Sequence, residues 1–154
     1  MLYLNAGLAS VALLSAAFLS DIDQPRWMAN MARHQKVVMY GVPAPYAAAR
    51  DPLPDNLAKL RRGAAVFDKH CSSCHGWSGN GEGAEGKFLV PAPADLKWLA
   101  RTPKNKSDPY IYWSIAEGGS SFNSDMPSYK RTLSKRDIWS VTAFVRSGMS
   151  QTSP

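Results

Sequence analysis

The sequence has 154 residues, enough for one domain with an additional segment, and its hydrophobic content of 45% is ordinary for a globular protein. Its formal net charge is +6, from 18 Lys and Arg against 12 Asp and Glu. No nucleic-acid-binding module accompanies this charge, which argues against a nucleic-acid partner. The alternatives are a solvated surface or a basic surface that docks an acidic partner protein. Residues 97–154 carry most of this net charge, and their basic residues fall mainly in two clusters, Lys97, Arg101, Lys104 and Lys106, then Lys130, Arg131, Lys135 and Arg136.

The first 22 residues predict a transmembrane anchor helix. Positions 2–19 are almost wholly apolar, and about 20 such residues are needed to span a bilayer. A cleaved signal peptide is the main alternative, but no Lys or Arg precedes the apolar stretch, so a retained anchor in residues 1–22 is favoured. The segment after the predicted anchor carries Arg26, Arg33 and Lys36. The positive-inside rule would therefore place this end of the anchor in the cytoplasm. The chemistry described below requires the opposite orientation.

Residues 23–56 are predicted to connect this anchor to a folded domain. The stretch up to Tyr40 is polar and compatible with a helix. Four prolines follow, at positions 43, 45, 52 and 54, and they favour extended backbone over a continuous helix. We interpret this proline-rich connector as a tether, or as a strap over a partner.

Residues 57–148 predict an all-α domain, followed by a tail over residues 149–154. Its first helix is expected from Leu57 after a cap at Asp55 or Asn56, and a short helical turn is expected over 95–99. The motif Ser107-Asp-Pro predicts a second helix that ends at Gly118. The last helix begins after Ser134, with Asp137 in a capping-box position, and ends near Gly148. No alternating pattern of useful length predicts a strand.

The most specific signal is the motif Cys71-Ser-Ser-Cys74-His75. Two thiols one helical turn apart can form thioether links to the two vinyl groups of a porphyrin, and the adjacent histidine then meets the iron. A redox dithiol is disfavoured because the motif follows a helix and runs into a glycine-rich loop. Structural zinc is disfavoured because only His34 and His70 remain as further ligands of the usual type. We therefore predict one covalent haem c.

Residues 57–147 resemble the class I monohaem cytochrome c domain, in its membrane-anchored bacterial respiratory form. The resemblance rests on the haem motif and on the stretches Gly63–Phe67, Gly79–Gly83, Pro91–Leu96, Asp125–Tyr129 and Leu133–Trp139, with Phe144-Val-Arg146. It implies three to five helices around the haem, with Gly63 and Phe67 packing near Phe144 where the first and last helices cross. It also implies His75 and Met126 as the axial ligands of the iron.

Met126 is the one methionine located between the two helices that follow the haem motif, and Pro127 comes directly after it. Methionine can also be an adaptable core residue, so its position is the argument for a ligand. A thioether favours reduced iron and fills the sixth coordination position. His70 is predicted to lie on the surface, and His34 is a weak alternative ligand.

Other cofactor-binding residues are expected around the haem. The resemblance implies that a proline-containing loop supplies a carbonyl to the proximal histidine, and Pro91 or Pro93 could serve, beside Leu96. The haem propionates need hydrogen-bond donors, for which the candidates are Trp98, Arg101, Tyr110, Tyr112 and Trp113.

These features predict single-electron transfer without enzymatic activity and without a small organic substrate. The chain would be a membrane-anchored cytochrome or a cytochrome subunit of a respiratory complex, either quinol-oxidising or a terminal oxidase. The alternatives are the electron-accepting subunit of a periplasmic dehydrogenase, or a haem enzyme or gas sensor with an open sixth position. The resemblance implies a bacterial inner-membrane location with the haem domain in the periplasm.

Overall fold

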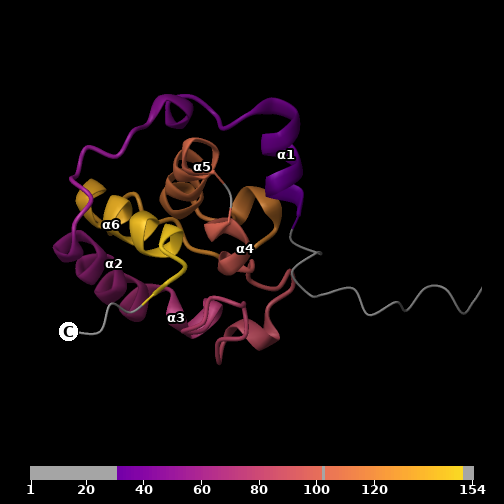
Figure 1. Cartoon of the computed structure of the whole chain (residues 1–154). Coiled ribbons are helices and arrows are strands. Elements are labelled where there is room, and N and C mark those ends of the chain that lie inside the picture. Colours follow the sequence, from indigo (N-terminus) through magenta and orange to yellow (C-terminus); the bar gives the residue numbers. More distant parts are fainter. Residues whose placement is uncertain (1–30, 102, 151–154) are drawn as a thin grey trace, which may run out of the picture.

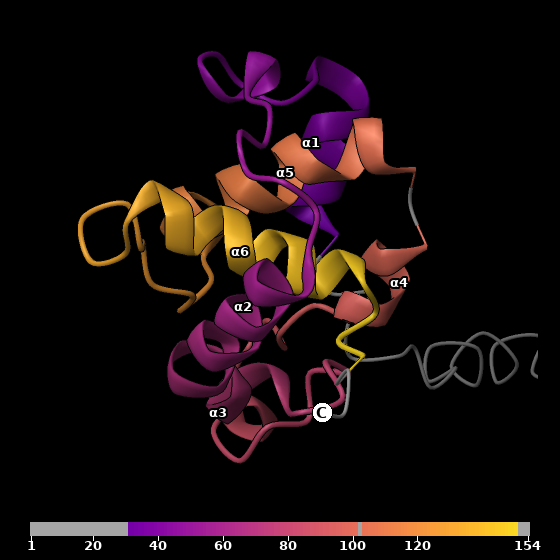
Figure 2. The same cartoon turned by 60° about the vertical axis from the view of Figure 1, so that its left-hand side comes forward.

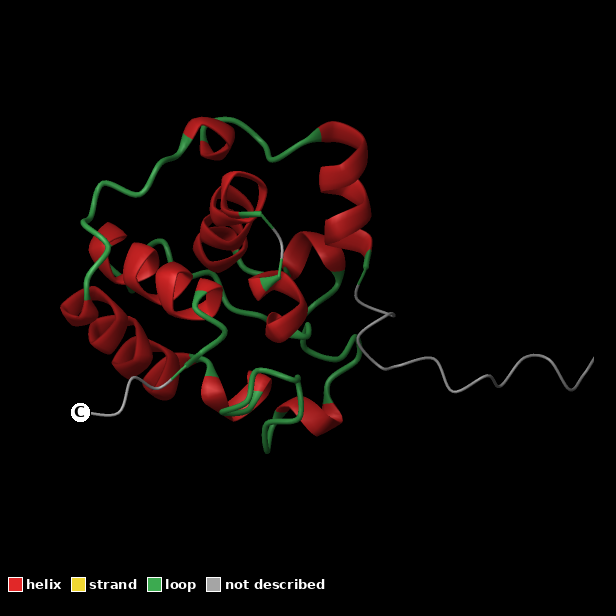
Figure 3. Cartoon of the chain, in the orientation of Figure 1, coloured by secondary structure: helices red, strands yellow, loops and turns green. Residues whose placement is uncertain are grey.

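The computed structural model describes residues 31–101 and 103–150, and within these residues every regular element is helical (Figure 3). The expected all-α class is therefore correct for the part of the chain that is described. Figure 1 shows the order of the helices along the chain. The α-helices are α1 (Ala32–Tyr40), α2 (Leu57–His70), α3 (Ser72–His75), α4 (Leu96–Ala100), α5 (Lys104–Glu117) and α6 (Lys135–Arg146). Short 3-10 turns are η2 (Tyr46–Ala48), η3 (Gly86–Phe88) and η4 (Ser120–Phe122).

Helices α2 and α6 cross in close contact (Figure 2). A Cβ atom on Gly63 would lie 2.1 Å from the carbonyl oxygen of Ser140, so only glycine allows this approach. One turn further along α2, the rings of Phe67 and Phe144 lie 5.6 Å apart between centroids. The expected packing of Gly63 and Phe67 against the last helix is confirmed.

The ends of the helices follow local sequence signals, with one exception. The side chains of Asn56 and Ser134 accept backbone hydrogen bonds at the starts of α2 and α6, as expected. The expected start of α5 after Ser107 is wrong, because α5 begins at Lys104 and contains Pro109. Proline removes one backbone hydrogen bond inside a helix, and the packing of the rest of α5 outweighs this loss.

The core lies between α5, α6, α4 and α2. Phe67, Ile111, Ile138 and Val141 are at most 3% exposed, and burial of this apolar surface is the main stabilising contribution. Two hydroxyl side chains of α6 are also fully buried, but each donates to the carbonyl four residues earlier. These bonds are Ser140 to Arg136 and Thr142 to Ile138, both 2.8 Å long.

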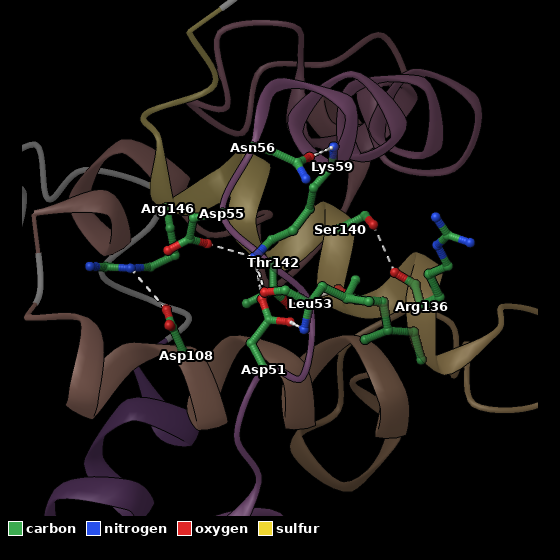
Figure 4. A network of polar contacts seen from close by, with 11 residues as sticks. Asp51, Leu53, Asp55, Asn56, Lys59, Asp108, Arg136, Ser140, Thr142 and Arg146 are labelled. Carbon is green, nitrogen blue, oxygen red and sulfur yellow. Dashed lines mark hydrogen bonds and ion pairs between the residues drawn. The ribbon is translucent and has the colours of Figure 1, made fainter.

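The proline-rich connector lies along the domain and does not stand apart from it. Tyr46 in η2 donates a hydrogen bond to the carboxylate of Glu117 at the end of α5. Lys59 in α2, with a side chain only 4% exposed, forms ion pairs of 2.7 Å with both Asp51 and Asp55 (Figure 4). The connector therefore lies over its own domain. Together with α1 it forms a segment, residues 32–56, that we call the strap.

No helix within the described residues is long and apolar enough to cross a membrane. The predicted anchor, residues 1–22, lies outside the described residues.

Candidate functional site

The Cys-x-x-Cys-His motif forms a tight helical turn directly after α2. Cys71 ends α2 and begins α3, and its carbonyl accepts a 2.9 Å hydrogen bond from the backbone N–H of His75. This turn places both thiols and the imidazole on the wall of one cavity. Cys71 and Cys74 are not joined in a disulfide.

The glycine-rich loop packs its backbone directly against this turn. Gly83 donates a 3.1 Å hydrogen bond to the carbonyl of Cys74, and Gly81 donates one of 2.9 Å to the carbonyl of His75. A Cβ atom on Gly83 would lie 2.2 Å from the carbonyl oxygen of Ser73. The loop thus fixes the motif by backbone contacts that a larger residue would prevent.

The imidazole of His75 is oriented by a backbone carbonyl, as a haem-binding histidine requires. Its Nδ1 lies 3.2 Å from the carbonyl oxygen of Ala94, which leaves Nε2 free to act as a ligand. The expected carbonyl from Pro91 or Pro93 is therefore wrong, since the acceptor is the residue after Pro93, although both prolines line the cavity. Burial lowers the pKa of His75 and favours the neutral ring that can bind a metal.

The thiols lack the acidity of a redox-active pair. Burial, together with the neighbouring Cys74, raises the pKa of Cys71 to about 12, and burial also raises the pKa of Cys74. Reactive dithiols have lowered pKa values, because the thiolate is the nucleophile. The environment therefore favours the haem motif over a thioredoxin-like dithiol. Among the described residues, no group of three or more His, Cys, Asp or Glu could hold a metal ion, as a closed zinc site would.

Met126 lies on a different wall of the same cavity, on a loop fixed to the end of α5. Gly119 donates a 2.7 Å hydrogen bond to the carbonyl of Met126. Just after it, the hydroxyl of Ser128 donates to the carbonyl of Ala116 at 2.7 Å, and the N–H of Tyr129 donates to Ile115 at 3.1 Å. The thioether is thereby carried by a well-anchored segment.

The structure brings most of the sequence-predicted residues to this cavity. Those that line it are Cys71, Cys74, His75, Pro91, Pro93, Leu96, Tyr110 and Met126. The candidates that do not line it are Trp98, Arg101, Tyr112 and Trp113. Arg101 is exposed, and Tyr112 and Trp113 are buried in other packing. Of the donors expected for the propionates, only Tyr110 lines the cavity, and its role as a donor stays a prediction.

The structure places the other two histidines at different positions. His70 is half-buried, lines the cavity and packs against the ring of Tyr129 at 5.8 Å, so its predicted surface position is correct only in part. His34 is brought to the domain by α1, where it packs edge-on against Trp98 at 4.7 Å. It does not line the cavity, which disfavours it as an alternative ligand.

Sequence reasoning did not connect several polar residues with the cavity wall, among them Arg33, Ser114, Glu85 and Asp125. Arg33 is only 9% exposed, and the hydroxyl oxygen of Ser114 is buried with no hydrogen-bond partner among the described residues. The rest of the wall is mainly apolar. Two thiols, an imidazole, a thioether and a polar corner on one apolar cavity form a donor set that fits haem c.

The match to a protein-family model agrees with this geometry. Residues 58–145 match the family "Cytochrome C oxidase, cbb3-type, subunit III". The chain belongs to this family. The cbb3-type subunit III domain is a cytochrome c electron-transfer domain, and the family implies covalent haem c attached to a Cys-x-x-Cys-His motif.

A solved structure shares the fold of this cbb3-type subunit III domain. It is a chain of the reducing HAO-like protein complex of Kuenenia stuttgartiensis, with a TM-score of 0.51 and 22% sequence identity. The match covers 73% of the present chain and 54% of that chain. The family match begins after the strap, at residue 58, so α1 and the connector lie outside it.

Proposed function

We propose that this chain moves single electrons through one haem c that is bound covalently at Cys71 and Cys74 and ligated by His75 and Met126. The observation that carries the proposal is the placement of all four side chains on one cavity, with the imidazole already oriented by Ala94. Haem iron supplies the one-electron couple when it is bound. The chain would thus act as an electron carrier and not as an enzyme.

The protein residues have separate tasks in this proposal. The two cysteines would hold the cofactor covalently, and Ala94 orients the ring of His75 so that Nε2 would be available as a ligand. The anchored loop would supply the thioether of Met126 as a second ligand, which would exclude oxygen and other small ligands. Buried apolar residues such as Phe67 and Ile111 exclude water and favour the less charged, reduced state.

The partner would dock at the rim of the cavity. Leu89 lines the cavity, whereas its neighbours Phe88 and Val90 are 84% and 85% exposed. Exposed apolar side chains of this kind mark interaction surfaces. The exposed basic residues Arg131, Lys135 and Arg136 would steer an acidic redox partner. A respiratory complex fits these features, and the partner would be a quinol-oxidising complex or a terminal oxidase.

The membrane-bound location belongs to the same proposal. Residues 1–22 would be a retained anchor, residues 23–56 the connecting segment, and residues 57–148 the haem domain on the periplasmic side. The intact mass of the mature haem protein, isolated from carbonate-washed membranes, tests the anchor directly. A mass that includes residues 1–22 supports it, and a soluble chain that begins near residue 20 contradicts it.

Replacing the proposed ligand tests the closed haem site. Met126→Ala should abolish the weak far-red methionine-to-iron band of the oxidised protein and lower its reduction potential. Met149→Ala is the matched control, because Met149 is also buried, at 7% exposure, but does not line the cavity. An unchanged far-red band in Met126→Ala would give the ligand role to another residue.

Mild detergent extraction tests the kind of complex. Co-purification with subunits of an oxidase or a quinol-oxidising complex supports the proposal. Co-purification with a periplasmic dehydrogenase would instead support a role as the electron-accepting subunit of that enzyme.

A further inference from the structure

Arg33 brings a positive charge to the wall of the cavity, although it lies outside the residues that match the family model. It belongs to α1, whereas the family match begins at residue 58. Its guanidinium donates to the carbonyl of Ser114 at 3.4 Å and also to the carbonyl of Gly118, both near the end of α5. The side chain therefore crosses from the strap to the domain and ends at the cavity wall.

The surroundings of Arg33 are largely aromatic. Its guanidinium carbon lies 5.0 Å from the ring centroid of Phe122 and 5.5 Å from that of Trp113. Burial lowers the pKa of Arg33, but an arginine stays charged in proteins.

This cation has no carboxylate partner among the described residues, unlike the other well-buried basic groups. Lys59 pairs with Asp51 and Asp55, and Arg146 pairs with Asp108 at 2.9 Å. A buried charge without a counter-charge is costly, so such groups are normally paired. The buried hydroxyl of Ser114 lies on the same cavity wall, beside Tyr110.

The haem has the complementary chemistry, since its two propionate side chains are carboxylates. The planar guanidinium fork matches a carboxylate in two hydrogen bonds, and the two carbonyls use only part of its five donor hydrogens. We propose that Arg33 binds a haem carboxylate, which makes helix α1 part of the haem site and raises the reduction potential. This inference rests on the haem site proposed above.

The competing explanation is purely structural. Arg33 also caps the carbonyl end of α5, where a cation is favourable, and so it attaches α1 to the domain. A structural cap would affect stability when removed, but it would leave the electronic environment of the iron unchanged. The reduction potential therefore distinguishes the two roles.

The test compares Arg33→Gln with Lys36→Gln in full-chain haem protein. Lys36 lies on the same helix, is exposed, and has its Nζ 5.5 Å from the Phe122 ring centroid, so it controls for loss of one positive charge. Arg33→Gln should shift the one-electron equilibrium at least tenfold toward the oxidised state, which is 59 mV. Lys36→Gln should shift it much less. Equal shifts in the two variants would overturn the proposal.

A second measurement covers the case in which Arg33→Gln does not accumulate. Arg33→Lys keeps the charge but loses the fork, so it should change the carboxylate bending bands of the haem in resonance Raman spectra. Unchanged bands would overturn the proposal. Covalent haem is first verified in the wild-type protein on a denaturing gel. Its absence there would refute the proposed function, whereas haem with an unaffected potential in Arg33→Gln would refute only the role of Arg33.

Discussion

The forces that stabilise the haem domain differ from those that attach the strap to it. The domain is closed by apolar packing, in which Phe67, Ile138 and Val141 are almost completely buried. The strap, residues 32–56, adds no residue to the most deeply buried core and leaves Val38, Met39 and Tyr40 at least 70% exposed. Polar side chains attach it at several points, and Tyr46, Ala49 and Leu53 also pack against the edge of the core.

The polar attachments occur at three separate points along the strap. Arg33 binds the end of α5, Tyr46 binds Glu117, and Asp51 with Asp55 binds Lys59. Because these attachments are polar, they bring charged side chains to the domain. One of these side chains, Arg33, lines the haem cavity. In the account proposed above, the domain supplies the fold and the haem ligands, whereas the strap would modify the site through Arg33.

The largest expected effect lies in the domain, at the crossing of α2 and α6. Gly63→Ala should lower the free energy of unfolding by about 3 kcal/mol, because its Cβ would lie 2.1 Å from the carbonyl oxygen of Ser140. Denaturant titration of the haem protein measures this change. Ala65→Ser, which adds one atom at an exposed position of the same helix, should cost less than about 0.5 kcal/mol. Equal effects would mean that the crossing is not tightly packed.

A smaller effect is expected where the strap meets the domain. Lys59→Met should lower the free energy of unfolding by about 2 kcal/mol, because it leaves Asp51, which is 12% exposed, without its cation. Arg62→Met is the control, since its 2.6 Å pair with Asp137 has a similar length but an arginine side chain 46% exposed. The control should cost less than about 1 kcal/mol. Equal losses in the two variants would show that burial of the contact between Lys59 and the strap adds nothing to the free energy of unfolding.

The smallest effect is a pH dependence at the start of α6. Hydrogen bonding from Ser134, and then from Arg62, lowers the pKa of Asp137 below its usual 3.8. A carboxyl with a lowered folded-state pKa stabilises the protein above its unfolded-state pKa, and this contribution is lost as the pH falls. Asp137→Asn should therefore reduce the loss of stability between pH 7 and pH 2, by less than about 1 kcal/mol. Denaturant titrations at the two pH values measure it, and an undiminished acid loss would contradict the assignment.

The sequence predicted the features that depend on local chemistry. The caps at Asn56 and Ser134 and the haem motif at residues 71–75 need only neighbouring residues to be recognised. The close packing at Gly63 was predicted because the family resemblance identified the crossing of the first and last helices.

Features set by tertiary packing were missed. Arg33 belongs to a polar segment before the family domain, and no local pattern connects it with a cavity more than 30 positions further along the chain. The choice of Ala94 over Pro91 or Pro93 depends on how the loop turns at His75. The earlier start of α5 overrides the proline signal for the same reason.

The most direct test of the central claim is exposure of the reduced, full-chain haem protein to carbon monoxide. If His75 and Met126 both bind the iron, the sixth position is filled and the visible spectrum should not change. The variant Met126→Ala should bind carbon monoxide readily under the same conditions and serves as the positive control. Ready binding by the wild-type protein would contradict the closed, electron-transferring site and would favour a haem enzyme or gas sensor.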